Sequence, residues 1–210
     1  MRKISITEAL NELKLYDAKI NKAISNAELI GAAKKSLDKV GVVKKDTFIE
    51  KAKSSYQSVT DLIANRNALK SAIVKSNAIT EVTVNGKTMT VAEVIERKNS
   101  IDYEITLLNE MKRQYVKATD TVTKENKRVD NKVDELIQTL VGKDTDKKID
   151  KDAIENIEAP YRTKNEYELV DPIGLSDKIA ELESDISGFE SNCDTTLAVA
   201  NATTFVELDF

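Results

Sequence analysis

The stretch Ser76-Asn77-Ala78-Ile79-Thr80-Glu81-Val82 decides the fold, because the chain repeats it close to its end. The second copy reads Ala200-Asn201-Ala202-Thr203-Thr204-Phe205-Val206, and four of the seven residues are identical. Each copy follows a helix-like segment and leads into a strand-like one. The repetition predicts a duplicated unit that ends in a helix followed by a short strand.

A second repeated feature opens each unit. Ser5-Ile6-Thr7-Glu8 and Thr90-Val91-Ala92-Glu93 both place a hydroxyl residue three positions before a glutamate. This spacing is typical of a capping box, in which the hydroxyl accepts from the amide of the glutamate and the glutamate accepts from the amide of the cap residue. We therefore predict helix starts at Ser5 and Thr90, completed by Glu8 and Glu93. The chain is predicted to be a single domain, residues 1–210, with internal duplication of 4–84 and 89–208.

Composition favours long helices. Charged residues make up 32% of the 210 residues and aromatic residues 5%, with six Gly and two Pro. The chain has no His, which excludes Ser-His-Asp and Cys-His catalysis and most zinc sites. We predict no enzyme activity, no catalytic residue, no cofactor and no metal.

Charge and hydropathy argue against two classes of partner. The formal net charge of -4 gives no bulk attraction to nucleic acid or to an anionic membrane. The segment 1–5 lacks the apolar run of a signal peptide, and no stretch approaches the ~18 apolar residues of a membrane span. We expect synthesis in the cytoplasm and no nucleic-acid or membrane partner.

Hydrophobic periodicity predicts four long helices. One helix should start at Ser5 and fade by about Leu37, and a basic turn over 38–46 should lead into a second helix after residue 46 or 47. The expected packing faces are Ile6, Leu10, Leu13, Tyr16, Ile20 and Ile24 on the first helix, and Phe48, Ala52, Tyr56, Val59, Ile63, Leu69 and Ile73 on the second. Together these two helices form an antiparallel hairpin.

Two strands should join the halves. The segment 79–84 alternates at a period of two, and Asn85-Gly86 is the strongest two-residue hairpin turn before the strand 87–90. If the duplication holds, the segment Phe205–Leu208 pairs with Arg2–Ser5 in the same way. We therefore predict a mainly α-helical (α+β) fold, an elongated antiparallel bundle of two pseudo-repeated hairpins with a small antiparallel β-sheet at one end.

The second unit carries extra length. Its first helix, from Thr90 to about Leu140, keeps an alternating 3-4 register, with a break open at the β-branched run 119–123. Residues 141–168 are expected to be a loop with one short helix, 151–158, that Pro160 ends. The segment 166–170 should be extended. The last helix follows Leu175, Ile179, Leu182, Ile186, Phe189, Cys193 and Leu197. The insertion at about 115–170 should project from the bundle.

Several polar residues have a structural explanation. Asn77 and Asn201 are expected to close helices in the left-handed conformation. Cys193 lies on an apolar seam. The carboxylates Glu8, Asp17, Glu93 and Asp102 repeat symmetrically, but the capping box already explains the glutamates. The segment 144–155 matches a calcium loop only in part, because Lys148 and Ile149 occupy positions 5 and 6. The lysines at 34, 35, 39, 44 and 45 are read as a hydrated turn.

One surface is a candidate for protein contacts. The outer half of the long helix from Thr90 has an apolar stripe that nothing in the duplicated unit covers, so burial favours a partner. The inserted segment, another copy and a different protein all remain open as that partner. The candidate face comprises Tyr115, Val122, Val129, Val133, Leu136 and Leu140.

The segments 76–98 and 166–208 resemble the septicolysin-like family of small helical bacterial and phage proteins. The first segment contains Asn77, then Gly86-Lys87-Thr88-Met89-Thr90 and Glu93, and the second contains Val170-Asp171 and the strand with Asn201. Together they cover about half of the chain. The resemblance implies no established catalytic residue. It implies a role in a virion or its assembly, and the name of the family implies a cytolysin.

These observations favour a non-enzymatic structural or assembly protein, a phage or prophage virion component that acts through helical contacts with itself or other virion components. Two alternatives stay open: a membrane-active cytolysin-like protein, and a protein that sequesters nucleotides or other small ligands through the turn from Lys34 to Lys45.

Overall fold

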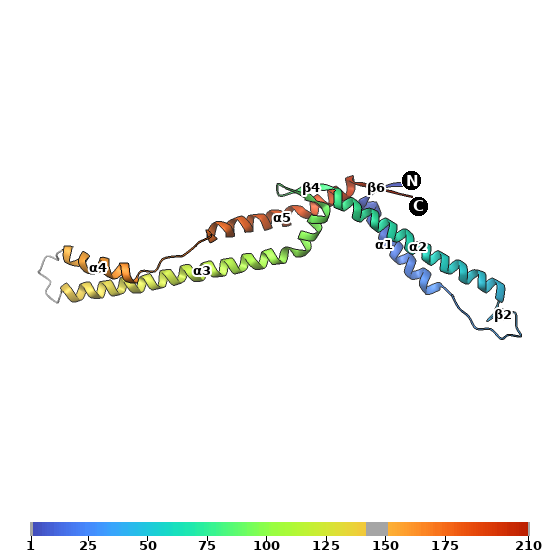
Figure 1. Cartoon of the computed structure of the whole chain (residues 1–210), viewed down its shortest axis with the longest axis horizontal. Helices are drawn as coiled ribbons and strands as arrows, with labels where there is room; N and C mark the ends of the chain where they lie inside the picture. Colours follow the sequence, from blue (N-terminus) through green and yellow to red (C-terminus); the bar gives the residue numbers. More distant parts are fainter. Residues whose placement is uncertain (1, 142–150, 210) are drawn as a thin grey trace. The chain divides into compact units, whose positions relative to one another are not determined.

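The structure, a computed structural model, describes residues 2–141 and 151–209. Within these residues the chain is mostly helical, and the strands are short and antiparallel, which confirms a mainly α fold with small β-structure (Figure 1). The sequence predicted one small sheet, whereas the described strands form three separate two-stranded ribbons. In chain order the elements are β1 (Arg2–Ser5), α1 (Ile6–Asn26), β2 (Lys39–Val40), β3 (Val43–Lys44), α2 (Lys45–Ile79), β4 (Glu81–Val84), β5 (Lys87–Thr90), α3 (Val91–Val141), α4 (Lys151–Asn165), α5 (Leu175–Thr203) and β6 (Phe205–Leu208).

The described chain divides into two compact units. The first contains the residues up to Ser100 together with those from Gly188 onward, and the second contains Ile101–Ser187. The first unit therefore holds every strand of the described residues, the α1–α2 hairpin, the start of α3 and the end of α5. The second holds the remainder of α3 and α5 together with α4.

Two ribbons of the first unit have the same register. In the ribbon of β1 and β6, Ser5 lies opposite Phe205 and Arg2 opposite Leu208, so the predicted pairing of the chain's two ends is confirmed. In the ribbon of β4 and β5, Thr90 lies opposite Glu81 and Lys87 opposite Val84. In the sequence repeat β1 corresponds to β5 and β6 corresponds to β4, and each residue pair in one ribbon has its counterpart in the other. A duplicated unit would produce this match, although the duplication itself stays a prediction.

The junctions between helices and strands also match. The amide of Ile6 donates to the carbonyl of Thr204 at 2.9 Å, and the amide of Val91 donates to the carbonyl of Thr80 at 2.8 Å. In each case the first residue of a helix satisfies a donor that has no partner inside that helix. The start of one helix is thus tied to the end of another in both halves of the chain.

The ribbon of β1 and β6 covers the base of the α1–α2 hairpin. The alternation of each strand points every second side chain toward the helices. Figure 1 shows the two chain ends side by side at this ribbon. The buried cluster contains Ile4, Ile6, Ala9, Leu69, Ile73, Val206 and Leu208.

The equivalent residues around the ribbon of β4 and β5 are buried as well. Val84, Val91 and Val94 are at most 2% exposed. Phe189 on α5 is fully buried, and the Arg97 guanidinium lies 4.5 Å from the centre of its ring. Cys193 lies in the same buried set, as its place on the apolar seam of α5 predicts. It has the sequence position that corresponds to Leu69 in the first core.

The tip of the α1–α2 hairpin differs from the sequence prediction. Helix α1 ends at Asn26 rather than near Leu37, because the following chain folds back toward α2. A Cβ on Gly31 would lie 2.5 Å from Val40 and 3.0 Å from Phe48, so this close approach requires glycine. The expected basic turn contains the short ribbon of β2 and β3, turned at Gly41 with φ 58°.

The second unit contains a helix longer than predicted. Pro160 was expected to end the helix that starts at Lys151, yet α4 continues to Asn165. Proline removes one backbone hydrogen bond, and three side-chain contacts support the turn beyond it. Thr163 and Asn165 donate to the carbonyls of Ala159 and Tyr161, both at 2.8 Å, and Arg162 pairs with Glu158 at 2.7 Å.

Candidate interaction surfaces

Both predicted capping boxes are present. The Ser5 amide donates to Glu8 at 2.8 Å and the Glu8 amide donates to the Ser5 hydroxyl at 3.2 Å. The corresponding distances at Thr90 and Glu93 are 2.6 and 3.2 Å. The amide of each cap residue, followed by its hydroxyl, lowers the pKa of the glutamate below its ordinary value. These carboxylates therefore serve the helix starts.

The predicted role of Asn77 and Asn201 is wrong. Neither residue has the left-handed conformation, and each helix continues past its asparagine, α2 to Ile79 and α5 to Thr203. The helices end instead at an extended Thr80 and at Thr204, whose amides donate to Ser76 and Ala200 at 2.9 Å. A helical hydrogen bond from the residue that precedes each strand closes the helix, so the asparagine is not needed as a cap.

The Asn85-Gly86 turn has the geometry that its sequence predicts. Asn85 has φ 50° and Gly86 has φ 76°, as a type I′ turn requires at both central positions. The turn lies against α5 where that helix carries Gly188. A Cβ on Gly188 would lie 2.3 Å from the side-chain nitrogen of Asn85. The absence of a side chain at Gly188 therefore makes room for the turn.

The polar residues in the seam of α3 have partners. Lys98 pairs with Asp194, and Lys112 pairs with Glu183 at 2.6 Å. Asn126 donates to the carbonyl of Tyr167 at 2.9 Å and accepts from its amide at 2.8 Å. Each contact joins α3 to a segment distant in sequence. These side chains therefore help to determine the position along α3 at which each later segment packs.

The run of β-branched residues does not break α3. The hydroxyls of Thr119 and Thr121 donate to the carbonyls of Tyr115 and Lys117, at 2.9 and 2.7 Å. These contacts satisfy the hydroxyls inside the helix. The open question of a break at 119–123 is settled, because α3 is continuous from Val91 to Val141.

The candidate face on α3 is largely covered by the chain itself. Val129 and Val133 are 6% and 1% exposed, and Tyr115, Val122 and Leu136 are half-buried. The side chain of Leu140 lies outside the described set. Burial of one valine contributes about 1.5–3 kcal/mol, so the covered stripe has little left to gain from a partner. Of the three partners that the sequence left open, the inserted segment covers this part of the stripe.

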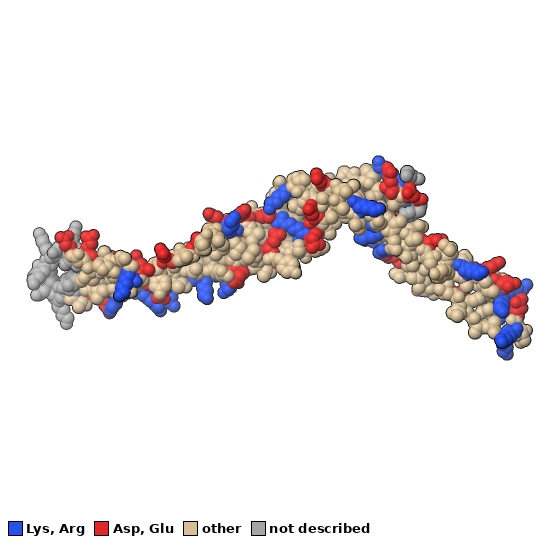
Figure 2. Space-filling view, in the orientation of Figure 1, with Lys and Arg blue, Asp and Glu red and all other residues tan. Residues whose placement is uncertain are grey.

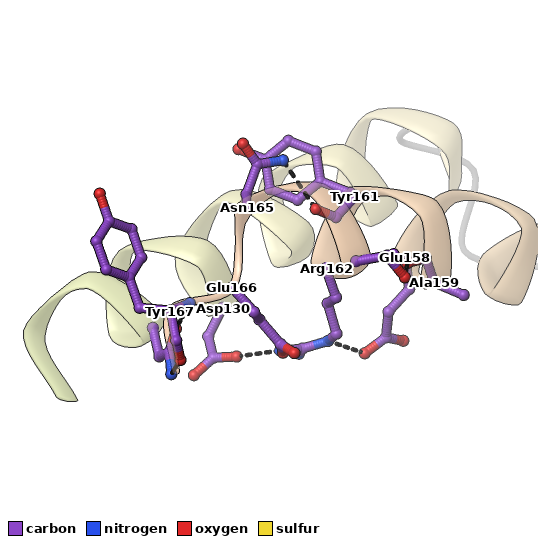
Figure 3. A network of polar contacts seen from close by, with 10 residues as sticks. Asp130, Glu158, Ala159, Tyr161, Arg162, Asn165, Glu166 and Tyr167 are labelled. Carbon is purple, nitrogen blue, oxygen red and sulfur yellow. Dashed lines mark hydrogen bonds and ion pairs between the residues drawn. The ribbon is translucent and has the colours of Figure 1, made fainter. Parts of the chain in front are cut away.

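A polar network holds α4 against α3 (Figure 3). Arg162 contacts Glu158 at 2.7 Å, Glu166 at 2.9 Å and, across the two helices, Asp130 of α3 at 2.6 Å. Hydrogen bonds to Glu158, Glu166 and Asp130 raise the pKa of the guanidinium above its ordinary value. These pairs are partly exposed, so they orient α4 more than they stabilise it.

The segment after α4 leaves a hollow on the second unit. Tyr115 and Ala118 of α3 line it together with Leu169, Pro172 and Leu175, and its volume is about 310 Å³. Of the predicted face, Tyr115 alone lines this hollow. Val170 and Ile173, which also line it, are 80% and 63% exposed.

A different apolar surface lies on the α1–α2 hairpin. The α2 residues that face α1 follow an alternating 4-3 spacing and are half-buried or buried: Phe48, Ala52, Ser55, Val59, Leu62, Arg66, Leu69, Ile73 and Ser76. Ile49, Tyr56 and Ile63 each come directly after one of them, at a spacing of seven, and are 40%, 61% and 37% exposed. The prediction that Tyr56 and Ile63 lie on the packed face of α2 is therefore wrong.

Helix α1 contributes to the same side. Leu10 and Ile24 each follow a residue that faces α2. Leu10 is half-buried and packs against the core cluster at the base of the hairpin, whereas Ile24 is 53% exposed, so the expected place of Ile24 on the packed face is wrong. Because the helices run antiparallel around one seam, the position after each such seam residue lies on the same side of both. We call this surface the α1–α2 apolar face: Leu10, Ile24, Ile49, Tyr56, Ile63 and Val74. The hydrophobic pattern had not predicted this face, although the seven-residue spacing of Ile49, Tyr56 and Ile63 indicates it.

The structure does not bring the remaining candidate residues, the carboxylates and the lysines, together in one site. Asp17 pairs with Arg66 at 2.8 Å, and Asp102 is exposed. Lys39 and Lys44 lie opposite each other in the ribbon of β2 and β3, so the basic tip brings two like charges together. The partial calcium motif falls largely outside the described residues. Among residues 2–141 and 151–209, no group of three or more acidic, Cys or His side chains could hold a metal ion.

Charge and length characterise the remaining surface. On the face that Figure 2 shows, basic and acidic side chains are interspersed and neither sign forms a continuous stripe. In the described part of the chain, no helix has both the length and the apolar character needed to cross a bilayer.

Comparison of the chain with protein-family models, curated proteins and solved structures found no match.

Proposed function

We propose that this chain is a non-enzymatic structural or assembly protein that acts through helical contacts with other protein chains. The observation that carries the proposal is the α1–α2 apolar face, where large side chains remain exposed at regular helical spacing. An isolated exposed apolar residue is ordinary, but a row of them along two adjacent helices is typical of a contact surface.

The setting we propose is a phage or prophage particle, or its assembly. This part of the proposal rests on the resemblance of 76–98 and 166–208 to the septicolysin-like family. The α1–α2 apolar face supports the general role, in which rigid helical hairpins present a surface to a partner.

Purification with native neighbours tests the proposal. The tagged chain is expressed together with the genes that flank its own, and the lysate is separated by sedimentation. We expect the chain to move with particles or with defined partner proteins. A Leu208→Asp variant, which places a carboxylate in the buried core, reports non-specific trapping of unfolded chain. A wild-type chain that always sediments as a free monomer contradicts the proposal.

A further inference from the structure

We infer that the α1–α2 apolar face binds the same face of a second copy of this chain, so that two hairpins form a four-helix bundle. The inference rests on the proposed function and names the partner. A helix that faces a bundle core carries apolar residues at three of every seven positions, and over 48–63 α2 has an apolar residue at each such position except Ser55. Two of these three positions face α1, and the third, at Ile49, Tyr56 and Ile63, remains 37–61% exposed.

The size of the face suits a second hairpin. The face covers residues 49–74 of α2, about 38 Å at about 1.5 Å per residue, and residues 10–24 of α1, about 21 Å. With about 10 Å of width for each helix, the area is roughly 600 Å² on each partner, which is the lower end of the ~1,200–2,000 Å² that specific interfaces bury in total. A single foreign helix has half this width. It would leave part of the row on α1 or α2 in water.

The charges of the face are compatible with self-association. At its centre Ile24, Tyr56 and Ile63 are flanked by the uncharged Asn21 and Thr60, so this region does not select an oppositely charged partner. Asp17, the acidic residue of the α1 row, is neutralised by Arg66 of the same hairpin. Lys14, Lys53 and Lys70 also directly follow seam residues, so they lie on this face among the apolar residues, and a long side chain there can reach solvent while its stem covers apolar surface.

Symmetry also favours a second copy. An interface between two identical faces closes with two chains, and each residue makes its contact twice. A bundle of two antiparallel helical hairpins satisfies this requirement without any change in the hairpin. The side of α2 that carries Lys51 and Ser58 is polar and would remain in solvent.

Oligomeric state as a function of concentration provides the test. We expect the full chain to form a dimer in sedimentation equilibrium. Tyr56→Glu places a charge within the face and should raise the dissociation constant at least tenfold. Tyr103→Glu is the matched control, because Tyr103 is 81% exposed on α3 and lies outside the face. It should change the constant less than twofold.

Two further measurements separate the outcomes. Circular dichroism checks that each variant is folded, and Ile63→Gln provides a milder change if Tyr56→Glu unfolds the chain. A chain that is monomeric at every concentration, or a dimer that both face variants leave intact, overturns the inference. A monomer that binds a different protein through Tyr56, detected by protection from hydroxyl-radical labelling, also overturns it but leaves the proposed function standing.

Discussion

At the scale of single residues, the turn between β4 and β5 shows how two distant positions depend on each other. Asn85 can adopt φ 50° because asparagine tolerates the left-handed region. Its side chain then occupies the space that a Cβ on Gly188 would need. The glycine costs α5 about 1 kcal/mol of helix propensity relative to alanine, and the docked turn offsets that cost.

A double-mutant cycle tests this dependence. In an Asn85→Gly background, Gly188→Ala should change the free energy of unfolding only through its gain in helix propensity. With Asn85 present, the same substitution should give a free energy of unfolding lower than that by at least about 1 kcal/mol. Glycine at position 85 keeps the positive φ, so the turn is retained. Urea denaturation of the four proteins gives the coupling. Equal effects in both backgrounds would show that the turn does not contact Gly188.

The two capping boxes predict a pH dependence of stability. Hydrogen bonds hold the pKa of Glu8 and Glu93 below the unfolded value of about 4.3. Their contribution is therefore complete above that unfolded value and is lost as the pH falls through the lower folded values. Glu8→Gln with Glu93→Gln should lower the melting temperature at pH 7, and the difference from wild type should close in acid.

Two exposed glutamates outside the caps provide the control. Glu28→Gln with Glu50→Gln makes the same change of charge without touching a helix start. Its melting curve should follow that of the wild type at each pH. If the capping variant differs from wild type by the same amount at pH 7 and pH 3, the caps do not carry the pH dependence.

At the scale of elements, the polar positions in the seam of α3 determine where later segments attach. The two hydrogen bonds between Asn126 and the backbone of Tyr167 hold a connection that has no regular structure of its own. An apolar residue at this position would leave the backbone donor and acceptor of Tyr167 without those partners. Both hydrogen bonds are exposed, so each contributes about 0.5–1.5 kcal/mol net.

Asn126→Ala should therefore loosen the connection between α4 and α5. We expect a loss of about 1–2 kcal/mol in the free energy of unfolding, and faster proteolytic cleavage between Tyr167 and Val170. Asn131→Ala is the control, because Asn131 is exposed on the same helix. Cleavage at equal rates in both variants would mean that the contact with Asn126 does not hold the connection.

Helix α2 shows why periodicity alone was insufficient at this scale. Its apolar residues form two adjacent stripes, one through Val59 and Leu69 and one through Tyr56 and Ile63, and the predicted packed face combined residues of both. Hydropathy does not distinguish two neighbouring stripes of similar character. The approach of α1 and the strands decides which one is buried.

At the scale of the whole molecule, the two ends of the chain complete a core that lies at the base of the first hairpin. Val206 and Leu208 are 6% and 3% exposed in a cluster with Ile6 and Leu69. The strand that supplies them is separated from those helices by more than a hundred residues of sequence. We therefore expect the stability of the first hairpin to depend on residues that are distant from it in the sequence.

Leu208→Ala tests this dependence. We expect a loss of about 2–4 kcal/mol in the free energy of unfolding, together with faster hydrogen exchange in α1. Phe205→Ala in the same strand is the control. Phe205 is 53% exposed, with Lys3 at 5.5 Å from its ring centre, and should cost less than about 1 kcal/mol. Unchanged exchange in α1 for Leu208→Ala would argue that the hairpin folds without β6.

The sequence by itself determined the capping boxes that start α1 and α3, the Asn-Gly turn, the 3-4 seam of α3 and the pairing of the chain ends. These features depend on spacings of a few residues, or on a repeat that can be read directly. The tertiary structure decided where α1 and α4 end, that Asn77 and Asn201 are not caps, and that α4 covers Val129 and Val133. It also decided that Ile49, Tyr56 and Ile63 stay exposed. Burial and helix ends depend on which segments meet in space, and an amphipathic pattern does not specify that contact.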